Sequence, residues 1–266
     1  MPRGSAKLRL LIVLSAIAAL TWQAAAKEPP VPPGLSPVGG VAVALLGPGV
    51  DYRRAELRRR FARDGEGVLI AWDFTDDDPA PFAEAGPGTA AAMTLAALAP
   101  AAQLVIVKQR KGDPQAFGHM MTFVARTPTR IVVWLEADPK RPDWPILAEA
   151  TKRFGDRLFV LPAGDGGKDL DRSAAYQGLR GAGNVVIVAS DAAAANRGVA
   201  TVDVMVSGGA GGLGLASGDA ALIIAAVAAR ALAIEPARSM AALKQAIVKH
   251  GRLTVDAANA AFGGKR

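Results

Sequence analysis

The sequence predicts an α/β fold with a doubly wound, mostly parallel seven-stranded sheet and helices on both of its faces. Short apolar runs rich in β-branched residues alternate along the chain with segments of helical periodicity. The strand-like runs are apolar almost throughout, which is typical of parallel strands buried on both faces. Hydrophobic residues make up 51% of the 266-residue chain, which is enough for one large core.

Strands and helices are expected in alternation for most of the chain. The expected strands are residues 41–46, 68–72, 104–108, 131–135, 158–162, 184–189 and 202–206. The expected helices are residues 52–62, 89–98, 114–125, 145–154, 217–234 and 240–250. Helix 89–98 has small apolar side chains nearly all round, which indicates burial against a close neighbour. Thr89 and Ser217 each precede an apolar run and are expected to cap their helices.

Residues 1–26 have the pattern of a secretory signal peptide. A basic head is followed by an apolar middle at residues 10–20 and by three alanines suited to cleavage at residues 24–26. An uncleaved anchor is the alternative, although residues 10–26 are short for a membrane span. We expect a periplasmic or secreted protein without stable membrane insertion after cleavage. A Pro-rich leader is expected at residues 27–40 and a single domain at residues 41–266.

Charge and composition exclude several classes of site. Removal of the signal segment lowers the formal charge from +7 to +4, with 28 basic against 24 acidic residues. Basic residues do not interleave with aromatic residues, so no nucleic-acid partner is expected. The arginines within residues 53–60 alternate with Leu57 and Phe61, which predicts the solvated face of helix 52–62. The absence of cysteine excludes disulfides, thiol nucleophiles and cysteine-ligated zinc.

Metal ions and cofactors are not expected. The two histidines, His119 and His250, are too few for a histidine-rich metal site. The aspartates at positions 76–78 and at 165, 169 and 171 match no defined calcium spacing, so turn and cap roles are favoured. Both histidines lie in helical patterns rather than after strands, so neither is expected to act as a catalytic base.

Seven fragments, taken in order, carry a family resemblance. They are VAVALLGPGVDYRRAEL, AWDFTDDDPAPFAEAGPGTAAAM, LAPAAQLVIVKQ, VLPAGDGG, NVVIVAS with VDVMVSGG, SGDAALIIAAVAARAL and GRLTVDAANAA. They resemble the opening strand, the approach to the GHGTHVAG helix, the VAPxAxLxxVKV strand, the AAGNxG segment, the strands before the nucleophile helix, the GTSxAAPHVAGxAAL helix and the closing GxLxVxxAL signature of the subtilases. The subtilases are the subtilisin-like serine peptidases of S8/S53 type. The resemblance spans residues 41 to about 261 and implies a subtilisin-like fold.

The chain departs from this family at the catalytic acid and base. The resemblance places Leu45 where the subtilases have their catalytic aspartate, or Leu46 if the gap is placed differently. It places Pro87 of Gly-Pro-Gly-Thr where they have histidine. Proline has no basic nitrogen, so a serine nucleophile beside it would lack its usual activation.

The remaining two positions are also altered or ambiguous. The asparagine that donates a hydrogen bond to the oxyanion is matched by Asp165, whose carboxylate would repel that oxyanion. The nucleophilic serine is matched by Ser217, or by Ala216 if the alignment shifts by one residue. The sequence therefore resembles a catalytically degenerate subtilase.

We therefore expect a subtilase-fold pseudopeptidase that binds a protein or an extended peptide and has no proteolytic activity. The first alternative is a divergent subtilisin-like serine endopeptidase or hydrolase that uses Ser217 with an unidentified base. A histidine, lysine or carboxylate within hydrogen-bond reach of the Ser217 hydroxyl would favour this alternative. The second alternative is a structural or assembly subunit that uses the fold as a scaffold.

The segment VWLEA is the expected binding groove. In the subtilases an extended substrate pairs with the matching backbone, and a small residue after it forms part of the pocket wall. Here Trp134, Leu135, Glu136 and Ala137 introduce bulk and a charge. Backbone pairing is expected to survive while the family's selectivity is lost, with Glu136 disfavouring acidic side chains. The ligand is expected to be an extended partner segment or this chain's own leader, residues 29–37.

The mature protein is expected to begin at or near Lys27, because the basic head, apolar middle and small-residue site form one export signal. Intact-mass and N-terminal analysis of exported protein will check this. Retention of Met1 or Pro2 would show that the segment is not cleaved.

Overall fold

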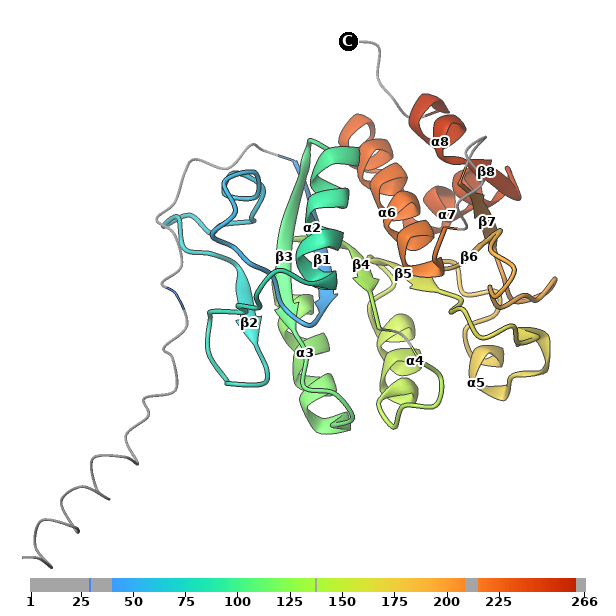
Figure 1. Ribbon diagram of the computed structural model, residues 1–266, viewed down its shortest axis with the longest axis horizontal. Helices are drawn as coiled ribbons and strands as arrows, with labels where there is room; N and C mark the ends of the chain where they lie inside the picture. The colour runs from blue at the N-terminus through green and yellow to red at the C-terminus, as the bar shows by residue number, and fades with distance from the viewer. Residues whose placement is uncertain (1–28, 30–39, 137, 209–214, 262–266) are drawn as a thin grey trace, which may run out of the picture. The chain divides into compact units, whose positions relative to one another are not determined.

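The computed structural model describes residues 29, 40–136, 138–208 and 215–261 (Figure 1). The chain divides into two compact units, Met1–Pro30 and Val31–Arg266, and the sheet with its helices belongs to the second. The expected signal segment, all of the leader except Pro29 and Gly40, and Ala137 lie outside the described residues.

The sheet has eight strands in the order β2-β3-β1-β4-β5-β6-β7-β8, and every neighbouring pair is parallel. The strands are β1 (Val41–Gly47), β2 (Ala71–Asp73), β3 (Ala102–Lys108), β4 (Thr129–Trp134), β5 (Leu158–Pro162), β6 (Val185–Ser190), β7 (Val204–Ser207) and β8 (Arg252–Thr254). The doubly wound parallel sheet is thus confirmed, with one strand more than expected. The additional strand, β8, is only three residues long and pairs with β7 at the sheet edge.

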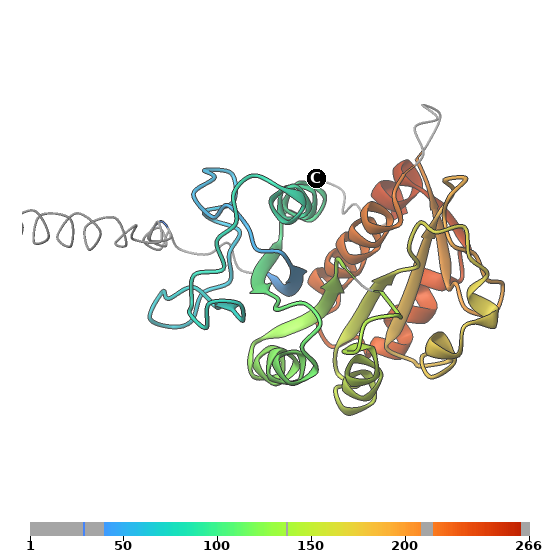
Figure 2. The same cartoon turned by 60° about the horizontal axis from the view of Figure 1, so that its bottom comes forward.

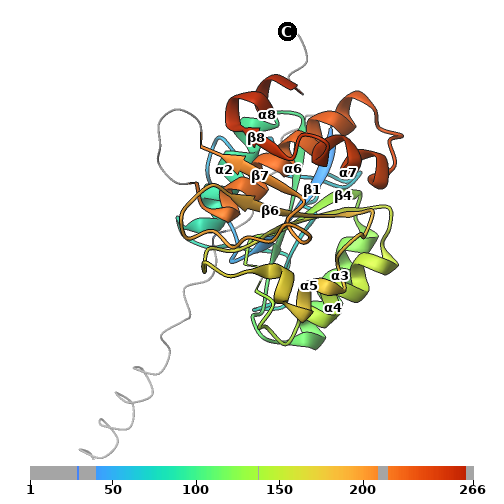
Figure 3. The same cartoon turned by 90° about the vertical axis from the view of Figure 1, so that its right-hand side faces the viewer.

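Helices cover both faces of the sheet (Figure 2). One face carries α2 (Pro87–Leu98), α6 (Ser217–Ile234) and α7 (Met240–Val248) over one apolar core. The other carries α3 (Pro114–Arg126), α4 (Trp144–Arg153) and the short α5 (Ala174–Gln177) over a second core. A single 3₁₀ turn, η1 (Leu170–Arg172), precedes α5, and α8 (Val255–Ala261) follows β8 and contacts α6 (Figure 3).

Helix α6 runs through the first core and is buried along most of its length. Its alanines allow it to approach the sheet closely, and Ile224, Ala225 and Ala228 are fully buried. By length and composition α6 could cross a bilayer, but 72% of that apolar window is buried inside the fold. Burial of this kind is what a core helix of a globular domain shows.

The start of α2 lies very close to the loop that follows β1. A Cβ atom added to Gly88 would stand 2.0 Å from the carbonyl oxygen of Gly49. Gly49 itself has φ +95°, in the region that favours glycine. The close neighbour inferred for helix 89–98 is therefore the loop after β1, which contacts the first turn of α2. The absence of a side chain at Gly88 permits this approach.

The expected helix at residues 52–62 is wrong, because this stretch forms successive four-residue turns. Its hydrogen bonds join Arg54 to Asp51 and Leu57 to Arg54, one residue shorter than in an α-helix. Phe61 bridges to Leu104 of β3, which draws the end of the segment onto the sheet. The crowded arginines also disfavour a helix through like-charge repulsion.

The helix caps differ from those expected. Gly86 is the N-cap of α2, with Pro87 at the first position, where a missing N–H costs nothing. Thr89 therefore lies inside the first turn of α2 and does not cap it. Ala216 is the N-cap of α6, and Ser217 is its first helical residue.

Candidate functional site

The carboxyl ends of the strands form the edge where ligands bind in open parallel sheets. The chain passes from β1 to β2 and β3 on one side and then crosses to β4 on the other, so the order of strands reverses at β1. Leu45 lies near the end of β1, Pro87 starts α2, Asp165 follows β5 and Ser217 starts α6. The structure joins Asp165 to Ser217 and gives Leu45 apolar surroundings.

Strand β1 presents no acid at this edge. Leu45 is buried in the core beneath α2 and α6, whereas Leu46 is buried in the opposite core beneath α3 and α4. Whichever leucine stands at the position of the subtilase aspartate, its side chain packs in a core. No carboxylate from this strand is available to orient a base.

The entrance of α2 also lacks a base. The Thr89 hydroxyl accepts a hydrogen bond from the backbone N–H of Asp51 at 2.9 Å. The Asp51 carboxylate in turn binds the Arg53 guanidinium at 2.8 Å, and this hydrogen bond holds the pKa of Asp51 below its usual value. A carboxylate with a lowered pKa is a poorer proton acceptor.

Asp165 and Ser217 form the central contact of the site. The Ser217 hydroxyl donates to Asp165 Oδ1 at 2.8 Å and lies 3.1 Å from the Gly164 carbonyl oxygen, a second acceptor. The Ser217 backbone N–H donates to the same carboxylate at 3.1 and 3.2 Å. The N-cap residue of α6, Ala216, has no side chain that can accept a hydrogen bond, so Asp165 caps the helix instead. Ser217 has 0% exposure, so its hydroxyl is not presented to solvent.

Asn196 holds the loop that carries Asp165. Its side-chain oxygen accepts from the N–H groups of Gly166 and Lys168, and its amide donates to the Ala163 carbonyl. Gly164 has φ +88°, and a Cβ there would lie 2.9 Å from Asn196 Nδ2. Asn196 was not anticipated from the sequence, because its partners are about thirty residues away and no motif surrounds it.

A cavity of about 580 Å³ opens beside Asp165. Its lining combines small or apolar residues such as Ala163 and Leu170 with charged residues of both signs. Asp138 and Pro139 extend the lining to the loop after β4. A cavity of this size is within the range of small-ligand and side-chain pockets.

The expected groove segment is only partly available to a ligand. Trp134 has 0% exposure and points into the core of α3 and α4, so its side chain does not line a groove. Its ring packs against Phe117 and Trp144, with centroid separations of 4.8 and 6.1 Å. Leu135 and Glu136 are half-buried, and Ala137 lies outside the described residues.

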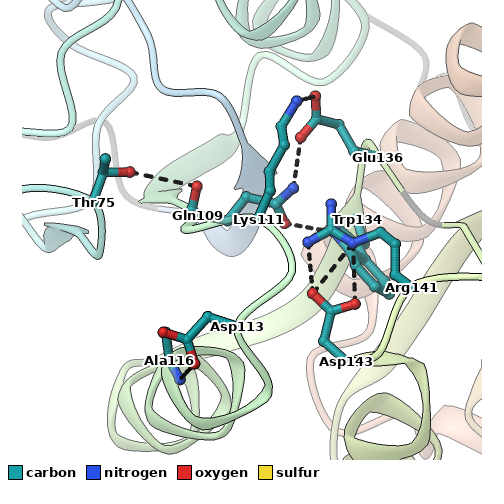
Figure 4. Close-up of polar contacts among 9 residues, drawn as sticks. All are labelled: Thr75, Gln109, Lys111, Asp113, Ala116, Trp134, Glu136, Arg141 and Asp143. Atoms are coloured by element: carbon teal, nitrogen blue, oxygen red, sulfur yellow. Dashed lines mark hydrogen bonds and ion pairs between the residues drawn. The ribbon is translucent and has the colours of Figure 1, made fainter.

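Glu136 is held by the loop that follows β3 (Figure 4). Gln109 donates from Nε2 to Glu136 Oε2 at 2.5 Å and accepts from Trp134 Nε1 at 2.7 Å. Lys111 forms an ion pair with Glu136 Oε1 at 2.6 Å. Because β1 lies between β3 and β4, these side chains cross over its end. Gln109 directly follows a strand, so its position could have been selected from the sequence, although its partners could not.

Two further ion pairs at the strand ends were not anticipated from the sequence. Lys108 and Asp73, at the ends of β3 and β2, form a pair at 2.5 Å in which the Asp73 side chain is fully buried. Arg141 pairs with the buried Asp143 at 2.5 Å and lies over the Trp134 ring (Figure 4). Both pairs stabilise strand-end loops rather than presenting free charge.

Of the other candidate aspartates, three accept backbone hydrogen bonds in turns and caps, whereas Asp76 contacts Lys108 and Asp77 accepts from the Trp72 indole. Asp78 accepts from the Ala80 N–H, Asp169 from Asp171, and Asp171 from Ala200. Among the residues that the structure describes, no cluster of three or more histidine or acidic side chains could hold a metal ion. His119 is exposed on α3, and His250 is exposed just after α7, so the structure pairs neither with Ser217.

The arrangement meets one condition of the hydrolase alternative and fails others. A carboxylate does lie within hydrogen-bond reach of the Ser217 hydroxyl. The same carboxylate, however, also occupies the Ser217 N–H, which would otherwise help to bind an oxyanion. A substrate carbonyl would have to displace Asp165 from both donors. In this arrangement the Asp165 carboxylate accepts hydrogen bonds from the first residue of α6.

Known proteins resemble this chain in structure rather than in sequence. Neither the protein-family models nor the curated protein sequences match it. A lanthipeptide protease has a TM-score of 0.63 at 15% identity, covering 84% of this chain and 88% of that one. A cold-adapted subtilisin-like serine proteinase has 0.61 at 16%, covering 81% and 84%, and the subtilase cytotoxin SubAB has 0.62 at 17%, covering 85% and 91%. The subtilisin-like fold expected from the sequence is confirmed.

Replacing Asp165 by alanine is expected to lower the free energy of unfolding by about 1 to 2 kcal/mol, because the first amide of α6 loses its cap. Asp165→Asn should lose less, since it keeps an acceptor oxygen. Urea unfolding with unchanged m-values will measure both. Asp191→Ala, which removes an exposed carboxylate, is the control and should change stability by less than about 0.5 kcal/mol. Equal stability of the alanine variants would contradict a capping role for Asp165.

Proposed function

We propose that this chain, which has the fold of the subtilisin-like proteases, is a non-proteolytic protein that binds an extended segment of a partner. The observation that carries the proposal is the contact between Asp165 and Ser217, in which one carboxylate takes both the N–H and the O–H of the serine. Leu45 and Pro87 add no acid and no base to it.

The binding role rests on the strand-end surface that remains. The cavity of about 580 Å³ lies beside Asp165, and the loop after β4 passes from Glu136 to its lining residues Asp138 and Pro139. An extended segment along this loop would pair with backbone and place one side chain in the cavity. Secretion or a periplasmic location is part of the proposal and follows from the signal pattern of residues 1–26.

The hydrolase alternative is kept because Asp165 lies 2.8 Å from the Ser217 hydroxyl. In that case Asp165 would accept the serine proton during attack on an acyl group. Carboxylates are generally weaker bases than imidazole, and the buried hydroxyl would first have to become accessible. These two requirements make binding without proteolysis the better-supported function.

The purified protein is expected neither to cleave casein nor to react with a fluorophosphonate probe, because Ser217 lacks an effective base and an open oxyanion site. Mass spectrometry of the labelled protein will measure the reaction, with Ser217→Ala as the blank. Stoichiometric labelling at Ser217 that disappears in Ser217→Ala would support the hydrolase. Loss of that labelling in Asp165→Asn as well would identify Asp165 as the base.

Occupancy of the groove is expected to protect the amide of Glu136 and those of the loop after Lys108, where an added strand could pair with the backbone. The amides of residues 131–135 already pair with β1 and β5 within the sheet and should not respond. Hydrogen exchange will compare the full mature chain, a variant lacking residues 29–37, and the full chain with excess denatured casein. Protection should fall without the leader or rise with casein. The same protection in all three states would argue against the groove and favour the scaffold alternative.

A further inference from the structure

The loops after β3 and β4 are joined by side chains that the proposed binding role does not explain. Gln109 is 4% exposed and uses both ends of its amide, donating to Glu136 and accepting from Trp134. Its backbone N–H donates to the Gly47 carbonyl at the end of β1. Three hydrogen bonds therefore hold Gln109 in place, and one of them also holds the Glu136 carboxylate.

Glu136 and Lys111 differ in the exposure of their side chains and in the number of hydrogen bonds that they make. The Glu136 side chain is 28% exposed, whereas that of Lys111 is 61% exposed. The contact that the structure gives the Lys111 ammonium is the 2.6 Å pair with Glu136 Oε1. An ion pair with so exposed a lysine contributes little net stability, so its exchange for another cation costs little.

A cation is nevertheless needed at this place. Glu136 is partly buried, and Gln109 supplies a neutral donor, so removal of Lys111 would leave the carboxylate charge without a counterion among the contacts described for it. Glu136 also begins the loop that reaches the cavity-lining Asp138 and Pro139. A segment lying along this loop would pass Glu136 before reaching the cavity.

We propose that Glu136 is the specificity-determining residue of the binding site, and that Lys111 occupies it as an internal substitute for a lysine or arginine of the partner. The partner segment is then extended and basic: its cation displaces Lys111 from Glu136, while its backbone lies along the loop that follows β4. An acidic side chain at the same place meets the Glu136 charge and is rejected. This inference rests on the proposed function, because it names the partner class of the same site.

The probes are two acetylated, amidated heptapeptides, SVTKVTS and SVTEVTS, which differ only in the central charge. The wild-type mature protein is expected to bind the lysine peptide about fivefold more tightly than the glutamate peptide at low salt. The preference should shrink in 0.3 M NaCl through screening. Calorimetric titration or fluorescence anisotropy will measure both affinities.

Three variants separate the roles of the residues. Lys111→Met removes the internal competitor and should raise the affinity for the lysine peptide further, by about fivefold. Glu136→Gln should bind both peptides equally. Lys152→Met is the matched control, because Lys152 is an exposed lysine on α4 whose pair with Glu149 lies away from the loops. It should leave both affinities unchanged, and urea unfolding will show whether each variant is folded.

Each outcome decides the inference. Tighter binding of the lysine peptide that depends on Glu136 and is enhanced by Lys111→Met supports it. Equal binding of the two peptides by the wild-type protein overturns the inference while leaving the binding role intact. A preference that survives Glu136→Gln, or no binding by Lys111→Met, also overturns it. Labelling of Ser217 by the fluorophosphonate would instead overturn the absence of proteolysis, whichever peptide binds.

Discussion

Burial of α6 is the constraint on which the site depends. The helix packs against one face of the sheet with most of its residues buried. It begins at the carboxyl edge, beside the loop that follows β5. A buried helix start leaves amide groups that must find acceptors. Asp165 supplies one from a loop 52 residues earlier in the chain. Asp165 therefore stabilises the start of the helix on which the first core is built.

A second set of contacts ties the strand ends together. Gln109 joins the ends of β3, β1 and β4, and the Thr75 hydroxyl lies 3.5 Å from the Gln109 carbonyl oxygen, as Figure 4 shows. Charged pairs such as Arg141 with Asp143 lie directly beside this network. Partly buried networks of this kind hold loops in one arrangement when every member is satisfied. Within the pair of Lys111 with Glu136, Lys111 is the more exposed member.

The fold and the chemistry of this chain must be considered separately. Structural likeness to proteases at 15 to 17% identity shows a shared arrangement of strands and helices. Function depends on side chains at the carboxyl edge, where Ser217 contacts Asp165 and β1 contributes only apolar residues and glycine. Leu45 belongs to the apolar core, and Pro87 fits the first position of α2 better than most residues would. Both residues therefore suit the positions that they occupy in the fold.

The sequence by itself determined the parallel α/β sheet, since apolar runs such as residues 158–162 become strands wherever both faces are covered. It also determined that β1 brings only apolar residues and glycine to the carboxyl edge. Local patterns failed where distant partners decided the outcome: residues 52–62 form turns because Phe61 pairs with β3, and Ser217 is capped by Asp165 rather than capping α6 itself. The pairing of Glu136 with Gln109 and Lys111 likewise exists only once β3 and β4 flank β1. Periodicity records burial along one segment, whereas the partner of a polar group depends on which segments the fold brings together.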